Sequence, residues 1–177
     1  MDFHRLQVKL IIRMRLIFTL VLSVAMTAFV SAQNGDYEAH NEGWLVKIDE
    51  AYAESQKTGK PIMANFTGSD WCGWCIKLTR DVFSKDEFKK WAEDNVVLLE
   101  LDFPRRKQLP ADLQQQNNSL RESFKVTGYP TVWVFDLDKS EENGNFTINA
   151  LGKTGYNRSV EAFITQCDEM IERSNRS

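Results

Sequence analysis

The feature that most constrains the fold of this chain is a nearly unbroken apolar segment, VVLLELD, at residues 96–102. A strand with one face in water alternates apolar and polar residues, whereas this segment is apolar at almost every position. Such a run is typical of a central strand that is covered on both faces. Two other strand-like runs, PIMANFT at 61–67 and TVWVF at 131–135, lie before and after it. We therefore expect a sheet with 96–102 as a central strand.

Helical patterns alternate with these strands. Trp44, Ile48 and Tyr52 recur every four residues, and Gly59 and Pro61 end that pattern. Further helical patterns begin at the WCGWC segment, at a capping box formed by Ser84 and Glu87, at residue 111 and at residue 159. Residues 33–43, which precede all of these elements, form a polar lead-in.

The C-terminal third adds a hairpin. Asn143-Gly144 is a turn signal, and residues 146–151 follow it as a second hairpin strand. The order of elements is then helix, strand, helix, strand, helix, strand, strand, helix. This order predicts an α/β fold, in which a central mixed sheet is flanked by helices.

Residues 1–32 have the pattern of a signal peptide. Four cations lie in the first 15 residues, an uncharged and mostly apolar segment follows at 16–30, and Val30-Ser31-Ala32 supplies small residues for cleavage. As a helix the apolar segment would be about 22 Å long, short of the roughly 30 Å bilayer core. We expect cleavage after Ala32 and a single domain at 33–177 that is periplasmic or secreted. The signal peptide would then contact the membrane only during export; the alternative is an uncleaved membrane anchor.

The charge balance excludes one class of partner. The whole chain has a net charge of −3, and its first 32 residues carry four cations against one acid. The mature domain is therefore more acidic than the whole chain, which argues against nucleic-acid binding because that role needs a basic patch. The 3 cysteines are too few for a disulfide-stapled scaffold.

The chemistry is concentrated at Cys72 and Cys75. Two cysteines separated by two residues at the start of a helix can close a small disulfide, and the unpaired N–H groups there favour an anion at the first of them. Such a position lowers the pKa of a cysteine from about 8.5 toward 7, so that more thiolate is available for disulfide exchange. We expect Cys72 to attack and Cys75, which lies deeper along the helix, to resolve the mixed disulfide.

Two other interpretations of the cysteine pair remain open. A zinc site needs two more ligands, for which only His40 and Cys167 are available after the leader. We expect no metal, because Cys167 lies on the apolar stripe of the last helix as a buried small residue. A purely structural Cys72–Cys75 disulfide is the second alternative.

The flanking tryptophans, Trp71 and Trp74, also have two interpretations. One of them can pack against the core, or the two can form an exposed apolar rim that holds an unfolded or extended substrate. We favour the rim.

Three motifs together resemble the thioredoxin superfamily. Lys60-Pro61 and an apolar strand lead into Trp71-Cys72-Gly73-Trp74-Cys75, residues 97–102 are similar to the family's central strand, and Gly128-Tyr129-Pro130-Thr131 is similar to its cis-proline loop. The chain looks most like secreted bacterial thioredoxin-like proteins with Phe-Thr-Gly-Ser-Asp-Trp-Cys-x-x-Cys, and it is also similar to the C-terminal periplasmic domain of the transmembrane disulfide reductase. The resemblance covers about residues 40–172.

The resemblance implies a thioredoxin fold in which Pro130 is cis and faces the cysteines. It also implies that the backbone of Tyr129 pairs with the substrate as an added strand. Tyr129, Pro130 and the motif residues Trp71, Gly73 and Trp74 would then contact the substrate. Apart from the redox-active disulfide, no cofactor is implied.

One position departs from thioredoxin, in which a buried aspartate assists proton transfer to the resolving thiol. The corresponding residue here is Asn65, whose amide cannot act as a base. Glu100 is the favoured substitute, alone or through water, and we add it to the catalytic residues. Asp70 is a second candidate, although a loop cap or a solvated charge is the expected role for it.

We therefore predict an exported oxidoreductase that exchanges disulfides with extracytoplasmic proteins. Gly73 and Trp74 supply no cation beside Cys72, which favours a reductase-like potential over a strongly oxidising one. The resemblance suggests a membrane-bound thiol electron donor. The alternative is a thioredoxin-fold module that binds client proteins through Trp71, Trp74 and Tyr129, with incidental redox activity.

Overall fold

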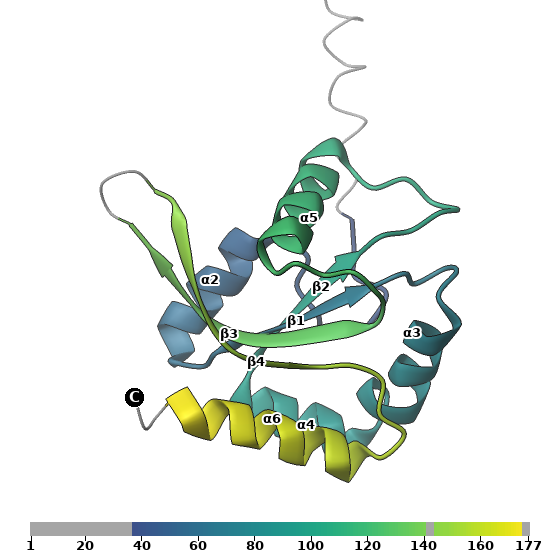
Figure 1. Ribbon diagram of the computed structural model, residues 1–177, viewed down its shortest axis with the longest axis vertical. Coiled ribbons are helices and arrows are strands. Elements are labelled where there is room, and N and C mark those ends of the chain that lie inside the picture. The colour runs from purple at the N-terminus through teal and green to yellow at the C-terminus, as the bar shows by residue number, and fades with distance from the viewer. Residues whose placement is uncertain (1–36, 141–143, 175–177) are drawn as a thin grey trace, which may run out of the picture. The chain divides into compact units, whose positions relative to one another are not determined.

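The computed structural model of this protein describes residues 37–140 and 144–174 (Figure 1). The predicted signal peptide, its cleavage site after Ala32 and Asn143 of the predicted turn lie outside the described residues. Within the described part, no helix has the length and apolar character that crossing a bilayer requires.

Four strands form one mixed sheet in the order β2-β1-β3-β4. β1 (Ile62–Thr67) pairs in parallel with β2 (Val97–Asp102) and antiparallel with β3 (Thr131–Lys139), which pairs antiparallel with β4 (Phe146–Thr154). The hairpin strands are longer than predicted. Gly144, which adopts a φ of 68°, lies in the connection between them, as the turn signal indicated.

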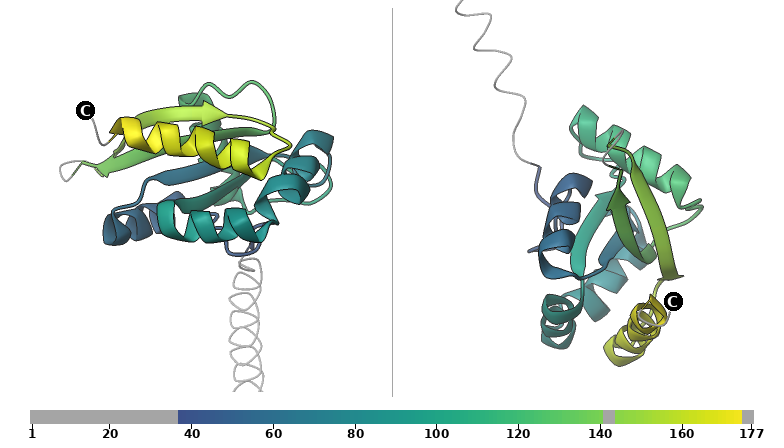
Figure 2. Two further views of the ribbon diagram at one scale, coloured as in Figure 1. Left: turned by 90° about the horizontal axis from the view of Figure 1, so that it is seen from below. Right: turned by 90° about the vertical axis from the view of Figure 1, so that its left-hand side faces the viewer.

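Helices cover both faces of this sheet. They are α2 (Ile48–Thr58), α3 (Gly73–Leu78), the π-helical turn η2 (Thr79–Phe83), α4 (Asp86–Asn95), α5 (Ala111–Ser123) and α6 (Val160–Ser174). One core cluster packs α2 and the end of α5 against Ile62, Ala64 and Phe66 on one face of the sheet. The other packs α3, α4 and α6 against Met63 on the opposite face. Figure 2 shows α4 and α6 running side by side on that second face. The predicted α/β architecture is confirmed.

The position of β2 in the sheet differs from the prediction. The VVLLELD strand lies at the edge, not in the middle, although both of its faces are buried. Its outer edge is partly paired, because Leu45 N–H donates to Leu98 O at 3.0 Å and Glu100 N–H donates to Leu45 O at 2.8 Å. The apolar run thus indicates that helices and this preceding segment bury the strand. It does not indicate whether the strand is central or at the edge of the sheet.

Two helix starts also differ from the sequence pattern. Trp44 lies before α2, which begins at Ile48, and its ring packs against Phe83 with centroids 4.9 Å apart. The predicted capping box is wrong: Lys85 is the N-cap of α4, and Ser84 Oγ donates to Thr79 O at 2.7 Å. Ser84 terminates the preceding helical turn, so it does not open the next helix.

Candidate active site

The two motif cysteines lie where β1 passes into α3. They form a disulfide, with Cα atoms 5.2 Å apart. Cys72 is the N-cap of α3, and its Sγ accepts the backbone N–H of Cys75 at 3.2 Å. This N–H belongs to the unpaired set at a helix start, so it would also donate to a Cys72 thiolate once the disulfide is reduced.

Both cysteines of the motif are buried, whereas the two residues between them are exposed. Cys72 is 6% exposed and Cys75 is 3% exposed, and Gly73 and Trp74 between them are exposed. The assignment of Cys72 as the attacking cysteine and Cys75 as the resolving cysteine stays a prediction.

The two tryptophans have different environments, which resolves the alternatives left open above. Trp71 is half-buried and packs: its Nε1–H donates to Phe103 O at 2.7 Å, and the Arg105 guanidinium lies 3.7 Å from its ring centroid. Trp74 is 56% exposed, with Lys77 Nζ 4.3 Å from its ring centroid. Of the two tryptophans, Trp74 is therefore the one that provides exposed apolar surface.

The cis-proline loop lies beside the motif. The Tyr129–Pro130 peptide bond is cis, as the resemblance implied. The Tyr129 ring meets Trp71 edge-on, with centroids 5.9 Å apart, and it also contacts Phe103 at 5.2 Å. These ring contacts bring the loop before β3 against the Trp71 end of the motif.

Asp102, at the end of β2, was not singled out by the sequence but anchors the motif loop. This buried carboxylate accepts the N–H and Oγ–H of Ser69 at 2.8 and 2.6 Å and the hydroxyl of Tyr37 at 3.0 Å. Lys107 Nζ lies 3.3 Å from the same carboxylate. Burial raises the pKa of Tyr37 to about 12, so its hydroxyl stays a donor. The available signal was a second carboxylate, after Glu100, at the end of a mostly apolar strand.

Asp70 acts as the loop cap that was expected. Its exposed carboxylate accepts the backbone N–H groups of Arg105 and Arg106, at 3.0 and 2.6 Å. The hydrogen bond from Arg105 and then that from Arg106 hold the pKa of Asp70 below its usual range. Asp70 and Asp102 together fasten the loop before the cysteines to the loop after β2.

Glu100 lies on the same face of the sheet as α3, directly beside Asn65 in the strand register. Its carboxylate is 1% exposed and accepts the N–H of His40 at 2.6 Å, and the N–H and side-chain amide of Asn41 at 3.1 and 2.6 Å. Burial raises the pKa of Glu100 above its ordinary value, although these donors oppose the shift. The oxygen of Asn65 is buried with no hydrogen-bond partner among the described residues.

Several known proteins are similar in sequence to this chain. The family described as thioredoxin-like matches residues 43–136, more than half of the chain. The chain belongs to the thioredoxin-like family. Over 93 residues it is 40% identical to "Disulfide bond reductase DsbH" of Chlamydia pneumoniae, and over 164 residues it is 26% identical to "Thioredoxin-related protein DsbJ" of the same organism. These matches cover 50% and 92% of this chain but 56% and 46% of the relatives, so the chain spans about half the length of the curated relatives it matches.

Solved structures agree with this assignment. A structure titled "DsbH Oxidoreductase" superimposes with a TM-score of 0.63 at 27% identity, covering 82% of this chain and 98% of that one. A thioredoxin from Thermus thermophilus has a TM-score of 0.51 at 18% identity, covering 71% of this chain and 85% of that one, which is a likeness of fold alone. The predicted thioredoxin fold is confirmed.

The third cysteine of this thioredoxin-like domain lies apart from the motif. Cys167 is fully buried in the core cluster of α6, as predicted, and burial raises the pKa of its thiol to about 12. His40, the other residue considered as a zinc ligand, is exposed on the lead-in. Among residues 37–140 and 144–174, no three His, Cys, Asp or Glu side chains cluster as metal ligands would.

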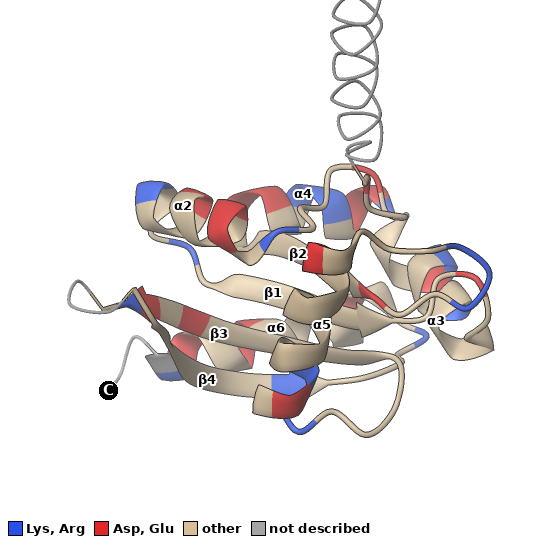
Figure 3. Cartoon of the chain, turned by 90° about the horizontal axis from the view of Figure 1, so that it is seen from above, with Lys and Arg blue, Asp and Glu red and all other residues tan. Residues whose placement is uncertain are grey.

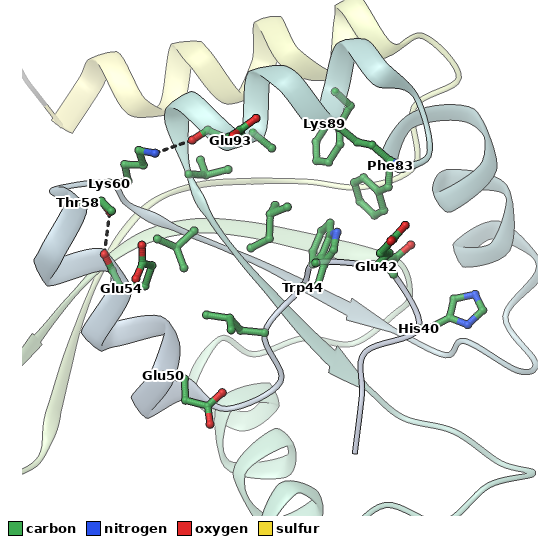
Figure 4. A pocket seen from close by; sticks show the side chains of 18 of the residues that line it. His40, Glu42, Trp44, Glu50, Glu54, Thr58, Lys60, Phe83, Lys89 and Glu93 are labelled. Carbon is green, nitrogen blue, oxygen red and sulfur yellow. Dashed lines mark hydrogen bonds between the residues drawn. The ribbon is translucent and has the colours of Figure 1, made fainter. Parts of the chain in front are cut away.

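A cavity of about 980 Å³ lies between the lead-in, α2 and α4 (Figure 4). Trp44 and Phe83 supply apolar surface, and Lys60 closes one end by donating to Glu93 O at 2.5 Å. The residues that line it include neither the motif nor the cis-proline loop, within the part of the chain that is described. We assign this cavity no part in the cysteine chemistry.

Proposed function

We propose that this protein is an exported thiol–disulfide oxidoreductase that reduces disulfides in extracytoplasmic proteins. The observation that carries the proposal is the Cys72–Cys75 disulfide at the leading end of α3, with the cis Tyr129–Pro130 bond beside it. A purely structural bridge would not need an exposed Gly73-Trp74 link or an adjacent loop that can pair with another chain.

The reaction transfers two electrons from the protein to the substrate. The Cys72 thiolate attacks one sulfur of a substrate disulfide; the Cys72–substrate S–S bond forms, the substrate S–S bond breaks, and the released sulfur takes up a proton. Cys75 then loses its proton and attacks Cys72 Sγ. The Cys72–Cys75 bond forms, and the second substrate sulfur leaves as a thiol.

The surrounding residues have distinct roles in this scheme. Trp74 and Gly73 provide the exposed surface on which the substrate rests, and the backbone of Tyr129, before Pro130, pairs with an extended substrate segment. Trp71 supports this surface through packing, because its ring contacts Arg105 and Tyr129. These residues take no part in the exchange of sulfur bonds; their proposed role is to bind the substrate.

Glu100 is the proposed acceptor of the Cys75 proton, alone or through water. Its location on the α3 face and the raised pKa caused by burial support this role, because a carboxyl group whose pKa lies nearer neutrality is a better proton acceptor. The three N–H donors from the lead-in fix its orientation.

The proposed direction is reduction. The absence of a cation in the Gly73-Trp74 link supports it, as does the name of the Chlamydia pneumoniae relative, a disulfide bond reductase. A reductase must be re-reduced, and we assign this step to a membrane-bound thiol donor. Cleavage after Ala32 would release the domain on the far side of the membrane, and the N-terminal sequence of the protein recovered from cells tests that assignment.

Insulin reduction by residues 33–177, with dithiothreitol as electron source, tests the proposal. We expect activity in the wild type, none in Cys72→Ser, and full activity in Cys167→Ala, the matched control at a cysteine away from the motif. The potential of the Cys72/Cys75 couple is expected near roughly −270 mV, whereas a value near roughly −120 mV would indicate an oxidant. If Cys72→Ser still supported the protein's biological activity in cells, the client-binding module would be the better account.

A further inference from the structure

A cationic pocket of about 460 Å³ lies next to the exposed Trp74. It is lined by Lys77, Arg80, Asp81, Lys85, Tyr156 and Arg158. Four of these side chains are cationic and one is acidic, whereas the chain as a whole has a net charge of −3. Figure 3 shows basic segments on α3 and on the loops beside it. Cations therefore outnumber acids in this pocket although acids outnumber cations in the chain as a whole.

Aromatic and backbone contacts connect the pocket to the reactive centre. The centroid of the Tyr156 ring lies 4.9 Å from that of the Trp74 ring. Lys77 Nζ lies over the Trp74 ring, 4.3 Å from its centroid. Gly155 lies against the cis-proline loop, since a Cβ at this position would be 3.4 Å from Pro130 O. Gly155 and Tyr156 therefore link the cis-proline loop to the pocket.

The single acid of the pocket is already engaged. Asp81 accepts Arg80 Nε–H at 2.7 Å and the Tyr156 hydroxyl at 2.9 Å, and the hydrogen bond from Arg80 and then that from Tyr156 lower its pKa. These contacts hold Tyr156 beside Trp74. Because Asp81 pairs with Arg80, the pocket lining, among the described residues, holds no further carboxylate for the other three cations, Lys77, Lys85 and Arg158.

We propose that this pocket binds an acidic side chain of the substrate protein, on the segment that flanks the disulfide being reduced. A carboxylate matches the donors that Lys and Arg present, and opposite charges increase the rate of encounter. The exposed apolar surfaces of Trp74 and Ile76 lie along the same helix, so an acidic residue next to an apolar one is the preferred sequence. This inference rests on the proposed exchange function and specifies its substrate class.

Peptide disulfides test the inference. Three nine-residue peptides, each closed by one disulfide, carry two Asp, two Asn or two Lys beside one cysteine. The pre-reduced protein is mixed with each peptide, and its oxidation is followed by acid quench, alkylation and mass spectrometry. Each rate is divided by the rate of the same peptide with dithiothreitol, an uncharged thiol, which removes differences in intrinsic reactivity.

We expect the Asp peptide to react about three- to fivefold faster than the Asn peptide at low salt, and the Lys peptide to react more slowly than both. The ratio should approach one at high salt, because screening weakens exposed charge pairs. The double variant Lys85→Gln, Arg158→Gln should lose the preference. The matched control Lys47→Gln, Lys57→Gln removes the same charge from the N-cap and the last turn of α2 and should keep the preference.

Each other outcome counts against a specific step. Equal rates for the Asp and Asn peptides in the wild type overturn the acidic preference, while exchange with the Asn peptide upholds the proposed function. An equal loss in the two double variants means that overall charge, and not the pocket, steers the substrate. Failure to react with any peptide and with uncharged 2-hydroxyethyl disulfide overturns the exchange function, and this inference with it.

Discussion

Gly68→Ala is expected to destabilise the domain through Trp71. Gly68 is buried and does not adopt a positive φ, so its backbone can accommodate alanine. A Cβ at this position, however, would lie 2.5, 2.6 and 2.9 Å from three atoms of the Trp71 indole. A rigid ring system cannot give way as a flexible side chain can, and Trp71 also packs against Arg105 and Tyr129. The indole must therefore move as a unit.

The magnitude follows from what that movement disrupts. Overpacking at a buried site costs about 1–3 kcal/mol. Displacing the indole also weakens the 2.7 Å hydrogen bond from Trp71 Nε1 to Phe103 O, a loss of about 1 kcal/mol. Loss of chain entropy in the unfolded alanine variant offsets roughly 0.4–1 kcal/mol. The expected net loss in the free energy of unfolding is about 1–3.6 kcal/mol.

Urea unfolding of the oxidised domain measures this loss, with Gly73→Ala as the matched control. No atom lies within 4 Å of a Cβ at Gly73, among the described residues, so that variant has the same unfolded-state term without the clash. We expect Gly73→Ala to be neutral or slightly stabilised, and Gly68→Ala to unfold at a urea concentration roughly 1–2 M lower. Equal midpoints for the two variants would refute the reasoning that the glycine is required by the close indole.

Three further predictions concern the disulfide and the carboxylates around it. Cys75→Ser should accumulate a covalent adduct with a disulfide substrate, seen on a non-reducing gel, because the resolving thiol is missing; rapid release of the substrate would contradict its role. Tyr37→Phe should lower the free energy of unfolding by about 1 kcal/mol, since Asp102 loses a hydroxyl donor at 3.0 Å, and an unchanged urea midpoint would argue against that anchor. Because burial raises the pKa of Glu100, its contribution to stability is present below the ordinary value of 4.5 and is lost as the pH rises through the raised value. The stability of wild type minus that of Glu100→Gln should therefore fall as the pH rises above 4.5. The same variant should slow release of the substrate from the mixed disulfide in a pH-dependent manner, and an identical pH profile in both proteins would exclude Glu100 from proton transfer.

Local patterns predicted most of the elements but not the contacts between them. The cysteine spacing and the apolar run after Pro61 placed the motif at a strand-to-helix junction, which the disulfide at the N-cap of α3 confirms. The Ser84 and Glu87 pattern gave a false helix start, because Ser84 Oγ bonds instead to the turn before it. A hydroxyl near a helix boundary can serve either neighbour, and the sequence alone does not decide between them.

The sequence by itself indicated the cysteine pair and the elements that carry it, because spacing along the chain fixes which groups share a helix end; the order of attack is a prediction from the same spacing. Only the tertiary structure decided that VVLLELD is an edge strand, that Trp71 packs while Trp74 is exposed, and that Asp102 anchors the motif loop at Ser69. These outcomes depend on groups that are distant in sequence and close in space. Burial and hydrogen bonding between such groups are properties of the packed sheet, and no local pattern records them.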